Sequence, residues 1–190
     1  MNDPARHVPS AVRFLPAADR AAVAWKNGGG VTREVAGFPG GAGMADFSWR
    51  VSLAEVGADG PFSAFPEVDR TLTMVEGDGM RLTVGGRDVV VDTPYVPRDF
   101  PGDVPTDCRL LGAPVVNFNV MWRRGAVSAP PSVTVLRGRI RLPGTALLVA
   151  LGAEGAEVAG RELGHYDAVS LAGGDVDVWA RGPVGVVTGL

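Results

Sequence analysis

The chain has 190 residues, of which 46% are hydrophobic and 21% are charged, and its formal net charge is −3. This balance is typical of a globular protein and excludes a disordered tail, a collagen-like chain or a coiled coil. The slight acidity argues against a nucleic-acid-binding protein, which usually has a basic face.

Short segments rich in valine, leucine, threonine and aromatic residues recur between Gly, Pro and Asp residues, and this pattern predicts β-strands. In chain order the expected strands are Val12–Leu15, Val31–Ala36, Phe47–Glu55, Thr71–Glu76, Arg81–Val84, Val89–Asp92, Arg109–Leu111, Val115–Trp122, Val133–Leu136, Ala146–Leu151, Ala168–Leu171, Val176–Ala180 and Val184–Thr188. No window of a dozen residues sustains helical periodicity, and 27 glycines and 15 prolines favour tight turns. We therefore expect a nearly all-β protein.

An internal repeat indicates how these strands are organised. The repeated features, in order, are Gly86-Arg87 with Gly160-Arg161, Tyr95 with Tyr166, Gly102-Asp103 with Gly174-Asp175, and Pro114-Val115 with Pro183-Val184. Many short antiparallel strands are typical of a sandwich or a barrel, and the repeat favours a duplicated jelly-roll barrel. We expect halves at 11–124 and 132–190, with a linker near 123–131 where Arg-Arg-Gly and Pro-Pro interrupt the pattern.

Rare residue types draw attention to particular positions. Lys26 is the only lysine beside 17 arginines, and it is followed by Asn27, one of four asparagines. Asn117 and Asn119 alternate in one expected strand and therefore share a face. A lysine ammonium is a compact point charge that arginine does not reproduce, so we favour a functional role for Lys26 over chance retention.

The densest motif is Trp25–Glu34, which contains the consecutive glycines Gly28, Gly29 and Gly30. Glycine permits close backbone approach, so these amides could point at an anion or a carbonyl. The spacing matches neither a phosphate-binding P-loop nor a dinucleotide fingerprint. The alternative is a flexible turn before a strand.

A second motif lies in the expected strand Phe47–Glu55, where apolar and polar residues alternate. Arg50 and Ser52 share its polar face, which would point either into a barrel or into solvent. Further along, Asp69 and Arg70 could form a structural ion pair or hold a substrate carboxylate.

In order, these motifs resemble the HutD/Ves family. The matching segments are Trp25–Glu34, Trp49–Ser52, Asp59–Pro66, Asp69–Arg70 and Phe118–Met121, so the resemblance covers roughly residues 11 to 124. The chain departs from the expected pattern at Glu67, where the family has Gly, and at Asn117, where it has Asp. The second departure removes a carboxylate, which leaves Asn119 as the site candidate.

The resemblance implies a cupin-type fold in the bicupin form, with two jelly-roll barrel halves in one chain. It also implies a role in bacterial histidine utilisation. That role is regulatory: the protein would bind a pathway metabolite and limit flux without catalysing a pathway step.

We expect neither a metal nor another cofactor. Metal-dependent cupins present several histidines and a carboxylate, whereas His7 and His165 stand alone here and no His-x-His pattern occurs. Cys108 has no neighbouring histidine, and as the only cysteine it excludes an internal disulfide, which suggests a cytoplasmic protein. No apolar run approaches the roughly 20 residues of a membrane span, and Met1–Arg20 lacks the order of a signal peptide.

The leading hypothesis is a metal-free binding protein for a small carboxylate metabolite such as urocanate, formiminoglutamate or formylglutamate. Lysine or arginine would neutralise the carboxylate, amides would hold amide or formyl groups, and aromatic rings would cover the apolar part. The expected ligand-binding residues are Trp25, Lys26, Asn27, Gly28, Gly29, Gly30, Arg50, Ser52, Phe62, Asp69, Arg70 and Asn119.

Two alternatives stay open. One is a metal-independent isomerase or hydrolase, in which Lys26 acts as base and Asp69 or Glu34 as acid. The other is a protein-interaction module with an exposed apolar patch. We expect no nucleic-acid or membrane partner, and the oligomeric state, a homodimer included, is open.

Overall fold

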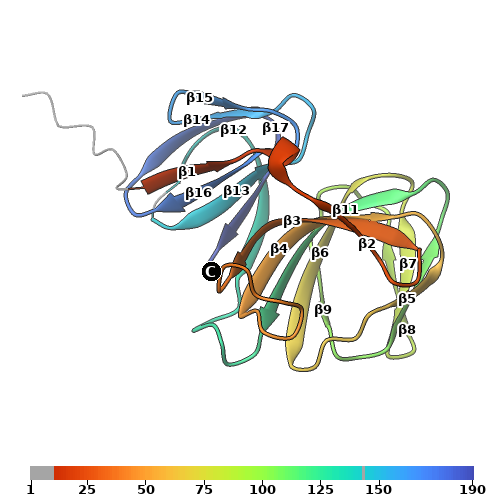
Figure 1. Cartoon of the computed structure of the whole chain (residues 1–190). Coiled ribbons are helices and arrows are strands. Elements are labelled where there is room, and N and C mark those ends of the chain that lie inside the picture. Colours follow the sequence, from red (N-terminus) through yellow and green to blue (C-terminus); the bar gives the residue numbers. More distant parts are fainter. Residues whose placement is uncertain (1–10, 143) are drawn as a thin grey trace, which may run out of the picture. The chain divides into compact units, whose positions relative to one another are not determined.

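The computed structural model describes residues 11–142 and 144–190, and it divides into two compact units (Figure 1). The middle unit is the continuous segment Arg20–Val133, and the terminal unit combines residues 11–19 with Thr134–Leu190. Apart from the short 3-10 helix η1 (Ala17–Asp19), every described element is a β-strand, which confirms the all-β prediction. No described helix has the length and apolarity that crossing a membrane requires.

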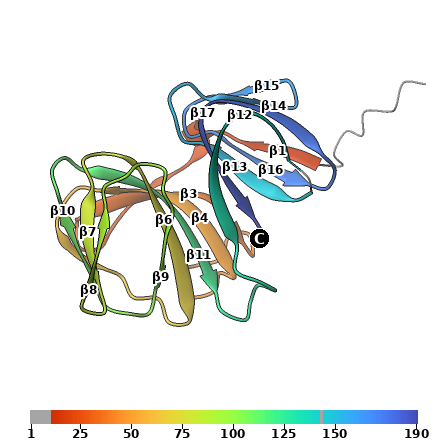
Figure 2. The same ribbon diagram turned by 180° about the vertical axis from the view of Figure 1, so that it is seen from behind.

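The middle unit is built from a six-stranded and a four-stranded sheet (Figure 2). The six-stranded sheet has the order β2 (Ala22–Ala24), β3 (Gly30–Phe38), β4 (Trp49–Val56), β11 (Val115–Arg123), β6 (Val68–Glu76) and β9 (Arg98–Pro101). The four-stranded sheet has the order β5 (Gly60–Phe62), β10 (Thr106–Leu110), β7 (Met80–Val84) and β8 (Arg87–Val91). Buried side chains of both sheets, among them Leu72, Met74 and Leu82, form one core.

The terminal unit is a single seven-stranded sheet. Its strands are β1 (Ala11–Leu15), β12 (Ser132–Leu142), β13 (Ala146–Ala150), β14 (Ala156–Val158), β15 (Arg161–Leu163), β16 (Ala168–Ala172) and β17 (Val176–Thr188). The first part of β17 pairs with β14 and its second part pairs with β13. The enclosed core consists of alanine, valine and leucine side chains.

The two units repeat one pattern of strand pairing. In the middle unit β6 pairs with β9 and β11, and β7 pairs with β8 and β10. In the terminal unit β13 pairs with β16 and β17, and β14 pairs with β15 and β17. Tyr95 and Tyr166 have φ of 65° and 64°, and their backbone amides donate to Met74 and Ala150. The sequence repeat therefore corresponds to equivalent structural positions.

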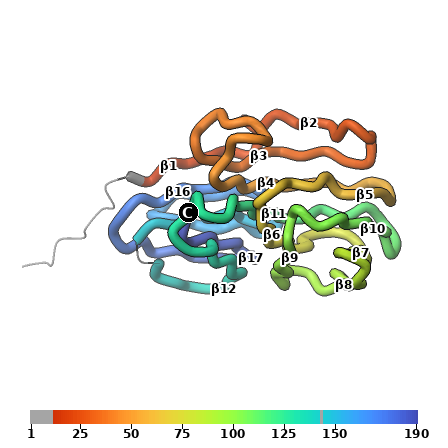
Figure 3. Tube along the Cα trace, turned by 90° about the horizontal axis from the view of Figure 1, so that it is seen from below, coloured from red at the N-terminus to blue at the C-terminus, as the bar shows by residue number. Residues whose placement is uncertain are grey.

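The N-terminal strand corrects the expected half 11–124. β1 pairs antiparallel with β16 (Figure 3), and the backbone amide of Ala17 donates to the Asp167 carboxylate at 2.7 Å. Residues 11–19 therefore belong to the terminal unit. The sequence pattern identifies the strand, but its distant partner is not visible in local periodicity.

The short strands also differ from the prediction. The strands β2, β5, β9, β14 and β15 were not expected, since three or four residues are too few to show alternation. The expected segments Val176–Ala180 and Val184–Thr188 form the single strand β17. The strand expected from Phe47 begins at Trp49.

The packing of β1 leads to a first prediction. Phe14 packs against the core of the terminal unit, and the Arg161 guanidinium lies 4.2 Å from its ring centroid. We expect Phe14→Ala to reduce the free energy of unfolding by about 2 kcal/mol, because apolar contacts are lost. Hydrogen exchange should accelerate in β13 and β16. Val23→Ala, at a side chain that is 60% exposed, should change stability by less than about 0.5 kcal/mol; equal effects would contradict the prediction.

Candidate functional site

One face of the six-stranded sheet carries both the core and a group of buried polar side chains. This inner face includes Leu72 and Met74, which pack toward the four-stranded sheet. Directly opposed residues of antiparallel strands point to the same side. Ser52, Asn119 and Leu72 are aligned in this way across β4, β11 and β6. Ser52 and Asn119 are therefore buried on the inner face.

Arg70 brings a positive charge to this face. Its residue is 8% exposed, and its Nη2 and Nε lie 3.2 Å and 3.4 Å from Oδ1 of Asn119. Among the described residues it has no carboxylate partner. Burial lowers the pKa of Arg70 to about 10, so the guanidinium stays charged at neutral pH. The site thus has a desolvated cation whose countercharge is missing.

Three aromatic rings surround this guanidinium. Its central carbon lies 5.2 Å from the ring centroid of Phe62, 6.0 Å from Phe65 and 5.1 Å from Phe100. Ring faces attract cations, and the attraction strengthens where water is excluded. Phe62 was expected in the site. Phe65 and Phe100 were not: Phe65 lies in the segment between β5 and β6, Phe100 lies in the short strand β9, and no local pattern shows that they converge on one side chain.

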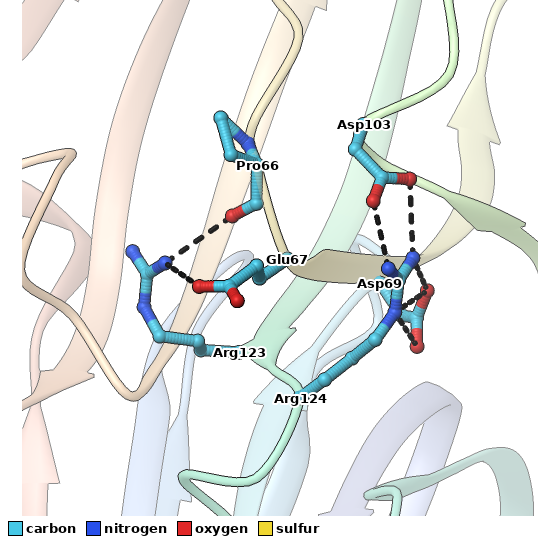
Figure 4. A network of polar contacts seen from close by, with 6 residues as sticks. All are labelled: Pro66, Glu67, Asp69, Asp103, Arg123 and Arg124. Carbon is cyan, nitrogen blue, oxygen red and sulfur yellow. Dashed lines mark hydrogen bonds and ion pairs between the residues drawn. The ribbon is translucent and has the colours of Figure 1, made fainter.

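Asp69 lies on the opposite side of β6 and joins a surface network (Figure 4). Neighbouring residues of a strand alternate in direction. The Arg124 guanidinium binds Asp69 at 2.6 Å and Asp103 at 2.7 Å, and Arg123 donates to the Pro66 carbonyl at 3.2 Å. The interpretation of Asp69 and Arg70 as an ion pair is therefore wrong, and Asp69 does not share the inner face.

Arg50 lies on the inner face but has its charge compensated. It is aligned with Met121 and Arg70 across the sheet, and its Nε lies 2.6 Å from Oε2 of Glu34. An arginine that already binds a carboxylate is a weaker candidate for holding a second one. Of the two arginines on this face, Arg70 is the better anion-binding group.

Asn117 is a further buried polar residue of the inner face, although its departure from the family pattern left Asn119 as the expected candidate. It is 2% exposed, and its Oδ1 has no hydrogen-bond partner among the described residues. It is aligned with Ala54 and Met74, so it faces the same side as Asn119, two residues further along β11. The alternation of these two asparagines was visible in the sequence, and it could have retained both as candidates.

The glycine-rich segment forms the tight turn between β2 and β3. The amide of Gly28 donates to the Trp25 carbonyl, and the amide of Gly29 donates to Oδ1 of Asn27 at 3.1 Å. Lys26 and Asn27 are exposed. These hydrogen bonds give Asn27 and the glycines a role in the turn itself, and two of the amides expected to bind a ligand already have acceptors.

Trp25 and Gly30 connect this turn to the rest of the middle unit. The Trp25 indole N–H donates to the Thr32 hydroxyl at 2.8 Å, and its ring meets the Phe62 ring edge-on at 5.9 Å between centroids. A Cβ atom at Gly30 would clash with the Glu55 carbonyl and lie 3.0 Å from the Trp25 ring. Trp25 is thus linked to the Arg70 environment through Phe62, and Gly30 is required by packing.

Cys108 is a poor nucleophile in this structure. It lies in the core of the middle unit, 3.7 Å from the sulfur of Met80, and burial raises the pKa of its thiol to about 11. Reactive cysteines depend on the thiolate form. His165 stacks on Tyr166, and His7 is outside the described residues. The described part of the chain holds no group of three or more His, Cys, Asp or Glu that could bind a metal ion.

Comparison of the sequence with known proteins identifies relatives over most of the chain. A family model described as HutD matches residues 17–186. The uncharacterized 21.2 kDa protein in the hutC 3' region of Pseudomonas putida is 36% identical over 173 residues, which cover 87% of this chain and 90% of that protein. Protein Ves of Cronobacter sakazakii is 35% identical over 121 residues, which cover 62% and 65% of the two chains.

Solved structures show a similar fold. HutD from Pseudomonas fluorescens SBW25 has a TM-score of 0.82 and 31% identity, covering 93% of this chain and 97% of that chain. A cupin 2 conserved barrel domain protein from Leptotrichia buccalis has a TM-score of 0.57 and 12% identity, with 87% and 91% covered. The second likeness concerns the fold alone, which is cupin-like.

The turn between β2 and β3 yields a second prediction. We expect Gly30→Ala to reduce the free energy of unfolding by roughly 2–3 kcal/mol, because the added methyl group overpacks against backbone. The matched control is Gly40→Ala, where a Cβ atom meets nothing within 4 Å and the effect should be below about 0.5 kcal/mol. Urea unfolding measures both. Similar losses in the two variants would contradict a packing role for Gly30.

The ion pairs of Arg124 with Asp69 and Asp103, on the side of β6 opposite the inner face, yield a third prediction. The hydrogen bond from Arg124 lowers the pKa of the Asp103 carboxyl. A carboxyl with a lowered folded-state pKa stabilises the protein above its unfolded pKa, and that contribution is lost as the pH falls through the folded value. The difference in Tm between the wild type and Arg124→Gln should therefore shrink between pH 6 and pH 3. Arg109→Gln removes a weaker, 3.9 Å pair with Asp59 and should show a smaller change.

Proposed function

Because the chain belongs to the HutD family and has a cupin-like fold, we propose that it binds a small carboxylate metabolite on the inner face of the middle unit. Arg70 is the anchoring residue of this proposal. The observation that carries it is the buried guanidinium without a carboxylate partner among the described residues. A buried charge is costly unless it is paired, and a bound carboxylate would supply the pair.

The orientation of Arg70 suits a carboxylate. Oδ1 of Asn119 occupies the edge formed by Nε and Nη2. The other edge, formed by Nη1 and Nη2, keeps donors for the two oxygens of a carboxylate. Each charge-assisted hydrogen bond contributes about 1.5–3 kcal/mol. Two of them, together with apolar contacts, support a dissociation constant on the order of micromolar.

The surrounding residues have separate roles in the proposal. The rings of Phe62, Phe65 and Phe100 exclude water from the guanidinium and strengthen its interaction with an anion. Ser52 and Asn119 supply neutral polar groups on the same face. Trp25, which contacts Phe62, would cover the apolar part of the ligand.

The metabolite in the proposal is an intermediate of histidine utilisation. Two relatives support this assignment: the P. putida protein in the hutC 3' region and HutD of P. fluorescens. Urocanate, formiminoglutamate and formylglutamate all carry a carboxylate and a further polar group. Binding would serve a regulatory, flux-limiting role in the cytoplasm.

The bicupin arrangement is also part of the proposal, with a cupin barrel in each unit. The repeated strand pairing supports it. We assign ligand binding to the middle unit alone, because Arg70, Asn117 and Asn119 all lie there.

Binding is favoured over catalysis by the placement of the candidate acid and base groups. Lys26 is exposed on the turn between β2 and β3. Asp69 faces the outer side and binds Arg124, while Glu34 binds Arg50. General acid–base catalysis requires such groups to lie within hydrogen-bonding reach of one substrate, and these three do not converge.

Calorimetric titration tests whether Arg70 binds the carboxylate of the ligand. The wild type should bind at least one of urocanate, formiminoglutamate and formylglutamate. Arg70→Met should weaken that binding by about 30-fold or more, because two charge-assisted hydrogen bonds are lost. Lys26→Met should change it less than about threefold, since the exposed ammonium lies outside the site. Arg70→Lys, which keeps the charge but not the planar fork, should be intermediate.

The same titrations can contradict the proposal. If no compound of the panel binds at millimolar concentration, the pathway-metabolite hypothesis fails. If Lys26→Met abolishes binding and a folded Arg70→Met retains it, the site is the turn between β2 and β3. Thermal unfolding of each variant establishes that it is folded.

A further inference from the structure

The side-chain amide of Asn117 has an unmet hydrogen-bonding capacity. Asn117 is 2% exposed, and its Oδ1 is buried without a partner among the described residues. Buried polar groups in proteins are nearly always hydrogen-bonded, and an unpaired one reduces stability. A polar group that is kept at this cost calls for a partner that the described part of the chain does not provide.

Asn117 and Arg70 lie on the same face of the sheet. Asn117 points to the side of Met74, and Asn119, two residues along β11, binds the Arg70 guanidinium. Two residues of an antiparallel strand span about 7 Å. A small molecule held at Arg70 would extend past Asn119 to meet Asn117 with its other end.

We propose that Asn117 determines the specificity of the inner-face site by accepting a hydrogen bond from an N–H or O–H group of the ligand. The ligand class is a short carboxylic acid that carries such a donor at the end opposite its carboxylate, as an ω-amide does. This inference rests on the proposed function, since Arg70 must hold the carboxylate. It adds the second contact point, which excludes simple apolar acids.

Two acids of matched shape separate this contact from the rest of the site. Glutaramate ends in a primary amide, and 5-oxohexanoate replaces the amide NH₂ with a methyl group while keeping the carboxylate and the carbonyl. The wild type should bind glutaramate about tenfold more tightly, because only glutaramate satisfies the buried acceptor. Calorimetric or equilibrium-dialysis titration gives both dissociation constants.

Substitution of Asn117 should remove the preference for glutaramate over 5-oxohexanoate. In Asn117→Leu the ratio of the two dissociation constants should fall to about one, mainly through weaker binding of glutaramate. The Tm of this variant should equal or exceed that of the wild type, since a buried unpaired amide is lost. If Asn117→Leu does not fold, Asn117→Ala provides the same comparison.

Thr73 offers a matched control. Its Oγ1 is also buried without a hydrogen-bond partner in the described part of the chain, but Thr73 is aligned with Phe118 on the opposite side of the sheet. Thr73→Val removes an unpaired polar group of the same kind and should leave the tenfold ratio unchanged. A ratio that falls equally in Thr73→Val would overturn the role of Asn117.

The remaining outcomes separate this inference from the proposed function. If the wild type binds both acids equally and Arg70→Met binds neither, the role of Asn117 is overturned and the carboxylate site stands. If the tenfold ratio persists in Asn117→Leu, the donor is recognised elsewhere and the inference is likewise overturned. If neither acid binds the wild type at millimolar concentration, both the inference and the proposed carboxylate site are contradicted for this class of ligand.

Discussion

The buried guanidinium of Arg70 places the strongest constraint on the middle unit, because moving a charge from water into a protein interior is costly. Asn119 accepts two of its N–H groups, and three phenylalanine rings replace part of its hydration. None of these neighbours carries a negative charge. The alternation of β6 directs Asp69 to the other side, where Arg124 and Asp103 compensate it. The strand thus separates two adjacent opposite charges, and among the described residues only the outer charge has a counterion.

The sequence predicted much of this architecture. The all-β class, most of the longer strands and the family membership are confirmed. Alternation in the segment that forms β4 predicted that Arg50 and Ser52 share a face, and in the structure this is the inner face. These predictions succeed because a period of two over eight or nine residues is a strong local signal. The repeat around Tyr95 and Tyr166 succeeds for a similar reason, since positive φ at a turn restricts the local backbone.

The remaining features depend on contacts between segments far apart in the sequence. The pairing of β1 with β16, and the convergence of Phe62, Phe65 and Phe100 on Arg70, leave no local pattern. Asn117 departs from the family pattern and was not an expected site residue, whereas its burial and the lack of a partner for its Oδ1 among the described residues are visible only in the structure. For the glycines Gly28, Gly29 and Gly30, by contrast, the sequence pattern was given too much weight as a sign of ligand binding. Close backbone approach was inferred correctly, but at Gly30 it is made to the chain's own Glu55 carbonyl.

The repeat allows the buried polar side chains of the described residues to be compared between the two units. In the middle unit Leu72 is aligned with Arg98, the third residue after Tyr95. In the terminal unit Leu148 is aligned with Val169, the third residue after Tyr166. Two residues earlier in each strand, Arg70 is aligned with Phe100 and Ala146 is aligned with Leu171. Arg70 and Ala146 therefore occupy corresponding positions. Every buried polar side chain among the described residues lies in the middle unit. A core of alanine, valine and leucine needs no partner for its stability. The described part of the terminal unit has no buried polar side chain, whereas the middle unit holds a buried cation without a carboxylate and a buried amide oxygen without a hydrogen-bond partner among the described residues.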